Sequence, residues 1–249
     1  MKTFWQMTWT ELKLQLREPI GAFFTLAFPL MLLFIFGSIY GNEPSEILGG
    51  FGSIDLSVPG YIGMIIGTIG MLSLPIALAT YREQGVLRRL QATPLPSSTI
   101  LWSQVAVNLV MTAFGALLLV TAGFLVYDLR PPEASLGLIA AALLGGLSFL
   151  AVGFVLAGVL PTPRAAQAVG MALFYPMLFL SGAAMPRQIM PESVQKFSEF
   201  LPLTHVVKLL EELWLNGTWN LTSLAVVIGL LVVGIIVSVG TTVDSYVVY

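Results

Sequence analysis

Side chains that carry out chemistry in enzymes are scarce in this chain. It contains no cysteine and a single histidine, His205, so neither a thiolate site nor a histidine metal site can be assembled. Each of its lysines follows Met, Leu, Gln or Val, whereas the lysine of a Walker A loop follows glycine. The HExxH and GxSxG patterns of hydrolases are absent as well. The sequence therefore predicts no catalytic residue, no bound metal and no cofactor held by this chain.

The most concentrated group of charges stands between two long apolar runs, in the stretch YREQGVLRRLQATP at 81–94, called the charged segment below. Leu87 and Leu90 share a face if the segment is helical, while the charged side chains occupy other faces. Thr93-Pro94 ends such a helix, because proline disfavours the α conformation of the residue before it. The segment is predicted to form a short amphipathic helix, which is either a plain connector or a docking surface.

The overall composition is that of a membrane protein. Of 249 residues, 57% are hydrophobic and 10% are charged, against about 25% charged in soluble domains. So few charges could not keep the surface of a soluble fold of this size in water. The net charge of −2 and the absence of a basic patch interleaved with aromatic residues argue against nucleic acid as a partner. We predict an all-α polytopic membrane protein.

Helices of about 20 apolar residues cross the hydrocarbon core of a bilayer. Six stretches have this length, and Pro29 in the first and Pro176 in the fifth are candidate kinks. The charged segment lies between the second and the third. The predicted spans, within one transmembrane domain over 1–249, are about 20–40, 59–80, 100–127, 136–160, 165–184 and 221–243.

Two further regions are amphipathic. In residues 1–19, Trp5 and Trp9 begin a series of apolar residues spaced four, three and four apart beside a polar face. This pattern predicts a helix that lies along the membrane surface with its tryptophans at the headgroups. Residues 185–220 are divided by prolines into pieces too short to span, and their apolar faces predict two short external helices, on the membrane or re-entrant.

The predicted second span carries glycines that are spaced three, four and three residues apart. This spacing puts them on one stripe of a helix, where the missing side chains let another helix approach closely. Packing is the favoured interpretation, and a direct role in lining a substrate path is the alternative. The four glycines are Gly60, Gly63, Gly67 and Gly70.

The distribution of basic residues predicts the orientation. An even number of spans puts both termini on one side, together with the charged segment and the turn at 161–164. That side holds seven Lys and Arg residues and four acids, whereas the other side holds four Lys and Arg residues and nine acids. Cytoplasmic loops are enriched in Lys and Arg, so both termini and the charged segment are expected in the cytoplasm.

The predicted spans contain none of the Asp, Glu, Lys, Arg or His residues with which proton-coupled carriers usually handle their ion. Since the chain has no nucleotide site either, any uphill transport must draw its energy from a partner at the cytoplasmic surface. Among the expected cytoplasmic loops, only the charged segment has the size and amphipathicity to receive that partner. This favours docking over a plain connection.

The order of these elements resembles the membrane subunit of type-2 ABC exporters. Residues 82–94, REQGVLRRLQATP, are similar to the family's R-E-x-G-x-L-x-x-L-x-x-T-P motif after the second span. Residues 201–207, LPLTHVV, with the later Gly217, are similar to the family's x-P-L-T-x-x-V…G segment. The amphipathic N-terminal helix and the two short helices before the last span complete a resemblance that covers nearly the whole chain.

The resemblance implies a permease that works as a dimer with a second copy or a homologous permease, each bound to a separate ABC ATPase that carries ATP and Mg²⁺. Residues 81–94 would be the coupling helix in a groove of that ATPase, and 1–19 the connecting helix that braces it. Arg88 stands where many relatives place an acid, so a different charge is expected in the groove. The implied contact and positioning residues are Arg82, Glu83, Gly85, Leu87, Arg88, Leu90, Thr93 and Pro94.

The resemblance also implies a pathway at the dimer interface, lined by the first, second and fifth spans. Through it a hydrophobic, amphipathic or lipid-like molecule would leave across the plasma membrane, which is the inner membrane in a bacterium. Aromatic and methionine side chains adapt to such molecules. The candidate lining residues are Phe24, Phe28, Phe34, Met64, Met71, Phe174, Tyr175, Met177 and Phe179.

Two other functions stay open on the sequence. The chain could be an autonomous facilitator or channel that needs no ATPase. It could also be a membrane anchor whose charged segment recruits a cytoplasmic partner without transport. An ATPase that binds through Leu87 and Gly85 would separate the exporter subunit from the autonomous facilitator.

Overall fold

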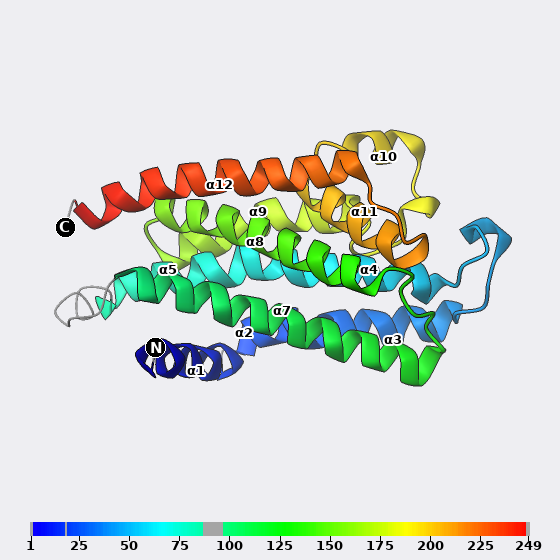
Figure 1. Cartoon of the computed structure of the whole chain (residues 1–249), viewed down its shortest axis with the longest axis horizontal. Coiled ribbons are helices and arrows are strands. Elements are labelled where there is room, and N and C mark those ends of the chain that lie inside the picture. Colours follow the sequence, from blue (N-terminus) through cyan, green and yellow to red (C-terminus); the bar gives the residue numbers. More distant parts are fainter. Residues whose placement is uncertain (1, 18, 87–96, 248–249) are drawn as a thin grey trace.

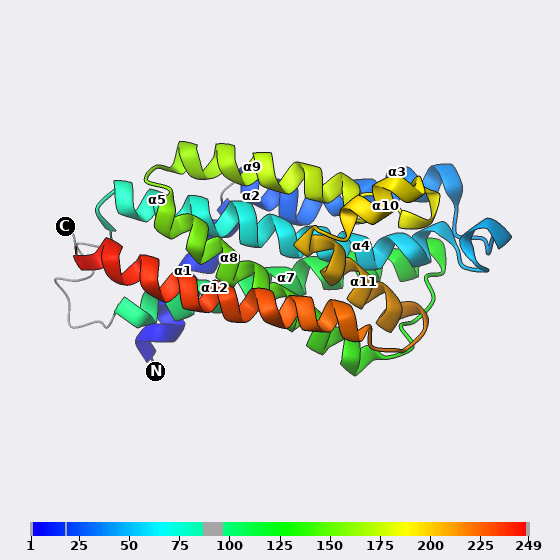
Figure 2. The same cartoon turned by 90° about the horizontal axis from the view of Figure 1, so that it is seen from above.

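The computed structural model describes residues 2–17, 19–86 and 97–247, and in these residues the fold is helical (Figure 1). Their only β pairing is an isolated bridge between Ser45 and Phe51. Five helical stretches of the described chain are long and apolar enough to cross a membrane, and they run lengthwise along one bundle (Figures 1 and 2). These stretches are Phe23–Tyr40, Ser53–Glu83, Thr99–Tyr127, Ser135–Val159 and Leu221–Ser238.

The first two stretches each contain a π-helical turn placed just before a proline. The turn η1 (Phe23–Ala27) separates α2 (Pro19–Ala22) from α3 (Phe28–Tyr40), and η3 (Ile69–Ser73) separates α4 (Ser53–Thr68) from α5 (Leu74–Glu83). Pro29 and Pro75 each follow such a turn by two residues. Proline has no N–H to donate and its ring crowds the carbonyl of the preceding turn, and a widened turn relieves both problems. The candidate kink at Pro29 thus lies beside η1.

Four further helices complete the bundle, and the predicted ends of two spans need correction. The fifth span was expected to reach residue 184, but α9 ends at Leu180, because Gly182 adopts a φ of +93° and turns the chain. The last helix, α12, continues to Val247, past the predicted end of the last span at residue 243. The four helices are α7 (Ser97–Tyr127), α8 (Ser135–Val159), α9 (Pro163–Leu180) and α12 (Leu221–Val247).

Helix α9 was expected as the fifth of six spans, yet it is not among the five stretches that are apolar enough to cross a membrane. It is 18 residues long and has Pro163 at its start. Arg164 and Gln167 lie in its first two turns and lower its hydropathy. It nevertheless packs along α5, parallel to the long helices (Figure 2).

The helix from Ser53 to Glu83 forms the centre of the bundle. In its most apolar window 89% of the residues are buried, against 17% for the last stretch. Helices α3, α7, α8, α9 and α11 (Pro202–Leu215) all pack against α4 or α5 (Figures 1 and 2). The core therefore surrounds the helix that leads directly into the charged segment.

The two ends of the bundle carry different structures. The N-terminus, the C-terminus and the end of α5 lie at one end (Figure 1). At the opposite end lie the 41–52 connection, the short turn η4 (Arg187–Ile189), and the helices α10 (Glu192–Ser198) and α11. Helix α11 packs into the bundle, and its apolar face, which includes Leu210 and Trp214, is buried.

The N-terminal helix α1 (Lys2–Arg17) packs across the start of α7, at the same end of the bundle as the two termini (Figure 2). Within this helix the side chain of Thr8 is buried, whereas those of Trp5 and Trp9 are 67% and 58% exposed. The tryptophan face therefore points away from the bundle. Such an exposed aromatic face suits the headgroup zone of a bilayer.

Candidate functional site

The charged segment begins as the last turn of the central helix. Residues 81–83 belong to α5, which ends at Glu83, and Glu83 is exposed. Gly85 then has a φ of +67°, and its amide donates to the Arg82 carbonyl at 3.1 Å. Glycine takes this left-handed conformation without strain, so it ends the helix. The segment 81–94 was predicted to be one helix, but its first three residues belong to α5, which ends before Gly85. The remaining candidate residues lie outside the described residues; they are Leu87, Arg88, Leu90, Thr93 and Pro94.

Arg82 attaches the end of α5 to the end of α8. Its Nη2 donates to the Ala157 carbonyl at 2.7 Å, and its Nη1 donates to the Leu160 carbonyl at 3.3 Å. The last carbonyls of a helix have no partner within the helix and carry a partial negative charge. A guanidinium can reach two of them because its N–H groups form a rigid fork. The start of the charged segment is therefore fastened to α8.

Tyr81 connects the same point to α1 and α7. Its hydroxyl donates to Oε2 of Glu11 in α1, and Gln104 Nε2 in α7 donates to the same oxygen at 2.9 Å. One turn further along both helices, Gln15 Nε2 donates to Asn108 Oδ1 at 3.1 Å. Burial raises the pKa of Glu11, and the two hydrogen bonds offset part of that shift. Helices α1, α5, α7 and α8 are thus all linked to Tyr81 or Arg82.

A buried acid organises the opposite end of the bundle. Asp55, 1% exposed, accepts hydrogen bonds from Asn42 Nδ2 at 3.0 Å and from the Arg130 amide at 3.0 Å. The Gly52 amide donates to its other oxygen at 3.2 Å. Asn42 Oδ1 in turn accepts from the amides of Ile54 and Asp55. These bonds satisfy the first turn of α4, which is why the helix begins at Ser53 and not at the predicted residue 59.

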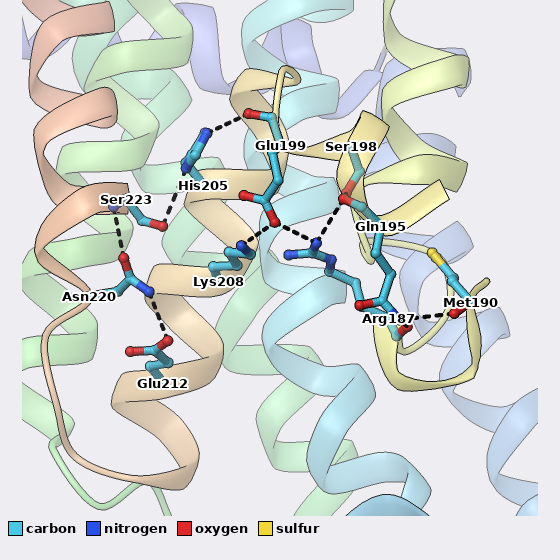
Figure 3. Close-up of polar contacts among 10 residues, drawn as sticks. All are labelled: Arg187, Met190, Gln195, Ser198, Glu199, His205, Lys208, Glu212, Asn220 and Ser223. Carbon is cyan, nitrogen blue, oxygen red and sulfur yellow. Dashed lines mark hydrogen bonds and ion pairs between the residues drawn. The ribbon is translucent and has the colours of Figure 1, made fainter. Parts of the chain in front are cut away.

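A second polar network joins η4, α10 and α11 at this end (Figure 3). Glu199 accepts from Arg187 Nη2 at 2.9 Å and from the Lys208 ammonium. Arg187 Nη2 also donates to the Gln195 carbonyl at 3.2 Å, and Gln195 Nε2 donates back to the Arg187 carbonyl at 3.0 Å. Burial acts to raise the pKa of Glu199, but the two cations outweigh it and hold the pKa below its usual value. The network makes 185–220 a folded cap.

His205 links this cap to α12 (Figure 3). Its Nε2 lies 2.9 Å from the Glu199 carbonyl oxygen, and its Nδ1 lies 3.3 Å from Ser223 Oγ. A carbonyl oxygen only accepts, so we assign the proton to Nε2, and in the neutral ring Nδ1 accepts from the Ser223 hydroxyl. Both ring nitrogens are therefore engaged in holding three segments together.

The glycine stripe of the second span contacts several elements and not one helix. A Cβ at Gly60 would lie 2.5 Å from the Gly182 carbonyl oxygen, and one at Gly70 would lie 2.5 Å from the Phe149 carbonyl oxygen. At Gly63 the nearest atom would be Val207 Cγ2 of α11, and at Gly67 it would be Phe174 Cε2 of α9. The stripe thus lets α8, α9 and α11 approach the central helix.

The candidate pathway residues differ widely in exposure. Met64, Met71, Phe174 and Met177 are buried in the hydrophobic core. Phe24 and Phe28 pack against each other with ring centroids 5.6 Å apart, and both are partly exposed. Phe34 and Phe179 are 43% and 60% exposed, and Tyr175 is partly buried beside Phe174.

The sequence analysis did not predict the polar contacts between α1 and α7 beside Tyr81. Glu11 and Gln15 are four residues apart in α1, and Gln104 and Asn108 are four apart in the otherwise apolar α7. Paired polar residues at this spacing on one face of a predicted span are a signal that could have been read. In the part of the chain that the structure describes, no group of three or more His, Asp or Glu side chains could hold a metal ion.

Comparison with known proteins adds a family. The family model described as "ABC-2 type transporter" matches residues 2–214. The chain is 28% identical over 170 residues to the "Probable multidrug ABC transporter permease YbhR" of Escherichia coli strain K12; the match covers 66% of this chain and 46% of the relative. Less than half of that relative is therefore spanned by the match.

Two other relatives are covered more completely. The "Putative transport permease ycf38" of Cyanophora paradoxa is 28% identical over 212 residues, which covers 83% of this chain and 72% of the relative. The protein of the same name from Pyropia yezoensis is 28% identical over 222 residues, which covers 86% of this chain and 74% of the relative.

Proposed function

Because the chain belongs to the ABC-2 type transporter family, we propose that it is the membrane-spanning permease subunit of an ATP-driven exporter. In this proposal the chain is not itself an enzyme, and a separate ABC ATPase binds ATP and Mg²⁺. The absence of a Walker A lysine and of charged residues within the predicted spans supports an external energy source. The names of its relatives, a multidrug ABC transporter permease and transport permeases, agree with this role.

The observation that carries the proposal is the attachment of Tyr81 and Arg82. These residues open the charged segment, and their hydrogen bonds reach Glu11 in α1, Gln104 in α7 through the shared carboxylate, and Ala157 in α8. A partner that pushes on residues 81–94 would therefore move four helices together. A plain connector would not require these hydrogen bonds to three other helices. Because α4 and α5 are buried at the centre of the bundle, they would carry a movement of residues 81–94 into the core.

The finer parts of the proposal are orientation, span number and assembly. We place both termini and residues 81–94 in the cytoplasm because of their excess of Lys and Arg, with α9 as a sixth, shorter span of a plasma-membrane protein. Two permease copies, identical or homologous, would enclose the pathway between them. The exposed Phe34 and Phe179 and the partly exposed Phe24, Phe28 and Tyr175 are the pathway candidates available to such an interface. A hydrophobic, amphipathic or lipid-like substrate suits them.

Co-purification from detergent tests the proposal. Native protein should carry an ABC ATPase that Leu87→Asp removes, because a charge in the apolar face of the segment prevents it from filling a groove. Gly85→Pro should do the same, since proline cannot adopt the φ of +67° found there. Leu136→Asp is the matched control: Leu136 is 85% exposed at the opposite end of the bundle, and its variant should keep the ATPase.

Three outcomes distinguish the alternatives. Loss of the ATPase only in the Leu87 and Gly85 variants supports the coupled permease. Flux through vesicles that contain this chain alone supports an autonomous facilitator and contradicts the proposal. A bound partner that has no ATPase activity supports a membrane anchor and contradicts it as well.

A further inference from the structure

A cavity whose lining includes several polar side chains lies where α1, α5 and α7 meet, at the end of the bundle that carries both termini. Its volume is about 330 Å³, and its lining includes Glu11, Gln15, Tyr81, Gln104 and Asn108. Gln104 and Asn108 are 3% and 1% exposed, so they are buried amides on an otherwise apolar helix. Such groups are costly to bury without partners, and a cavity of this size can hold a small ligand group or several waters.

Among the described residues, the lining contains one acid and no lysine, arginine or histidine. Glu11 is the only ionisable acid or base of the lining apart from the phenol of Tyr81, and within the described residues it forms no ion pair. Both of its donors, Tyr81 and Gln104, approach Oε2. Among the described residues Oε1 has no hydrogen-bond partner, and neither does Gln104 Oε1, whose amide nitrogen is already used. The cavity therefore offers acceptors and a negative charge.

The position of the cavity suggests the source of a ligand. Gln104 and Asn108 lie in the first turns of the spanning stretch that begins at Thr99, and α1 lies beside them with its tryptophans exposed. Amphipathic surface helices lie at the boundary between headgroups and acyl chains. Leu14, Ile76 and Ala77 supply an apolar wall next to the acceptors.

We propose that this cavity binds a primary ammonium group through the Glu11 carboxylate and the Gln104 amide oxygen, and that the group belongs to a phosphatidylethanolamine headgroup. A primary ammonium brings the missing positive charge and three N–H donors, whereas a choline headgroup brings the charge without donors. Anionic headgroups would meet the Glu11 charge and be repelled. The proposal does not depend on an ATPase or on the direction of transport.

The test uses the full chain, purified in detergent and exposed to equal amounts of phosphatidylethanolamine, phosphatidylcholine and phosphatidylglycerol. Native mass spectrometry should show selective retention of phosphatidylethanolamine. Glu11→Gln keeps an oxygen acceptor for Tyr81 and Gln104 but removes the charge, and should weaken retention about tenfold or more, as expected for loss of a charge-assisted hydrogen bond. Glu83→Gln, an exposed acid near the same site, should bind like the native protein.

A second variant guards against misfolding of the first. Ala77→Leu fills part of the cavity without touching its hydrogen bonds, and it should also lose selective retention while eluting as a native-sized particle. Free ethanolamine forms a separate arm: if it stabilises native protein but not Glu11→Gln while lipids show no selectivity, the same site takes a soluble ammonium compound. Equal retention of all three lipids with no effect of ethanolamine, or unchanged selectivity in both variants, overturns the proposal.

Discussion

The guanidinium of Arg82 lies against the carbonyl of Ala157, with Nη2 and the carbonyl oxygen 2.7 Å apart. This contact places a fixed positive charge at the C-terminal end of α8, where the partial charge of the helix is negative. It also makes the first residues of the charged segment part of the packed bundle. In the proposed function, this attachment would let a partner that binds the segment move α8 as well as α5.

Arg82→Ala should lower the free energy of unfolding by about 1.5–3 kcal/mol, the usual worth of hydrogen bonds to a charged group. Arg82→Lys should recover only part of the loss, because an ammonium lacks the fork that reaches both carbonyls. Thermal unfolding in detergent would measure the effect. Arg164→Ala is the control, since Arg164 is exposed at the same end of the bundle. Equal destabilisation by both alanine variants would contradict the assigned role of Arg82.

Asp55 and Asn42 are expected to act as one unit. Asp55→Ala leaves buried amide donors without an acceptor and should destabilise the protein by about 3 kcal/mol or more. Asn42→Ala removes the acceptor of the Ile54 and Asp55 amides and a donor to the Asp55 carboxylate. Because the two variants lose one bond in common, the double variant should be less destabilised than the sum of the two. Denaturant titration of the four proteins gives the coupling energy. Glu43 is an exposed acid next to Asn42, and Glu43→Ala should leave the free energy of unfolding nearly unchanged. If the effects of Asp55→Ala and Asn42→Ala simply add in the double variant, the two residues do not act as one unit.

Gly70 is expected to reject even a methyl group. Its Cβ would lie 2.5 Å from the Phe149 carbonyl oxygen, and backbone cannot move aside as a side chain can. Gly70→Ala should therefore cost about 1–3 kcal/mol. Gly229→Ala in α12 is the matched control, because a Cβ there would meet nothing within 4 Å. In an open helical position alanine is favoured over glycine by about 1 kcal/mol, so the control should gain stability. Thermal melts that shift in the same direction for both would refute the close approach of α8.

Glu211 should make the protein less stable as the pH rises. Burial raises its pKa above the usual 4.5, despite the hydrogen bond from Gln188 and the nearby Arg187 and Lys208. The folded protein then holds a proton that the unfolded chain has lost, so stability falls as the pH rises from 4.5 through the folded pKa. Glu211→Gln should melt at a higher temperature than native protein at neutral pH, and the difference should vanish below pH 4.5.

Melting curves between pH 4 and pH 8 would measure this difference, at intervals of about half a unit. Glu192→Gln is the control, because Glu192 is 89% exposed and pairs only with an exposed lysine. A difference between Glu211→Gln and native protein that stays constant over the whole range would show that the carboxyl does not titrate differently in the two states.

Much of the architecture was predictable because its signals are local. Apolar runs of sufficient length identified the spanning stretches, and the motif at 82–94 led to a family that the later comparison supports. Exact ends were less predictable, since they depend on contacts from elsewhere: Asn42 extends α4 back to Ser53, and Gly182 ends α9 early. Polar pairs such as Glu11 and Gln104 could not be matched across helices by spacing alone.

The sequence by itself determined the class of the protein, because a chain with 57% hydrophobic and 10% charged residues can bury its surface only in a bilayer. It also carried a contiguous motif at 82–94, from which we predict where a partner docks. Only the tertiary structure decided what that segment is fastened to. The bonds from Tyr81 to Glu11 and from Arg82 to Ala157 join residues far apart in the chain, and their geometry follows from how α1, α5, α7 and α8 pack around one another.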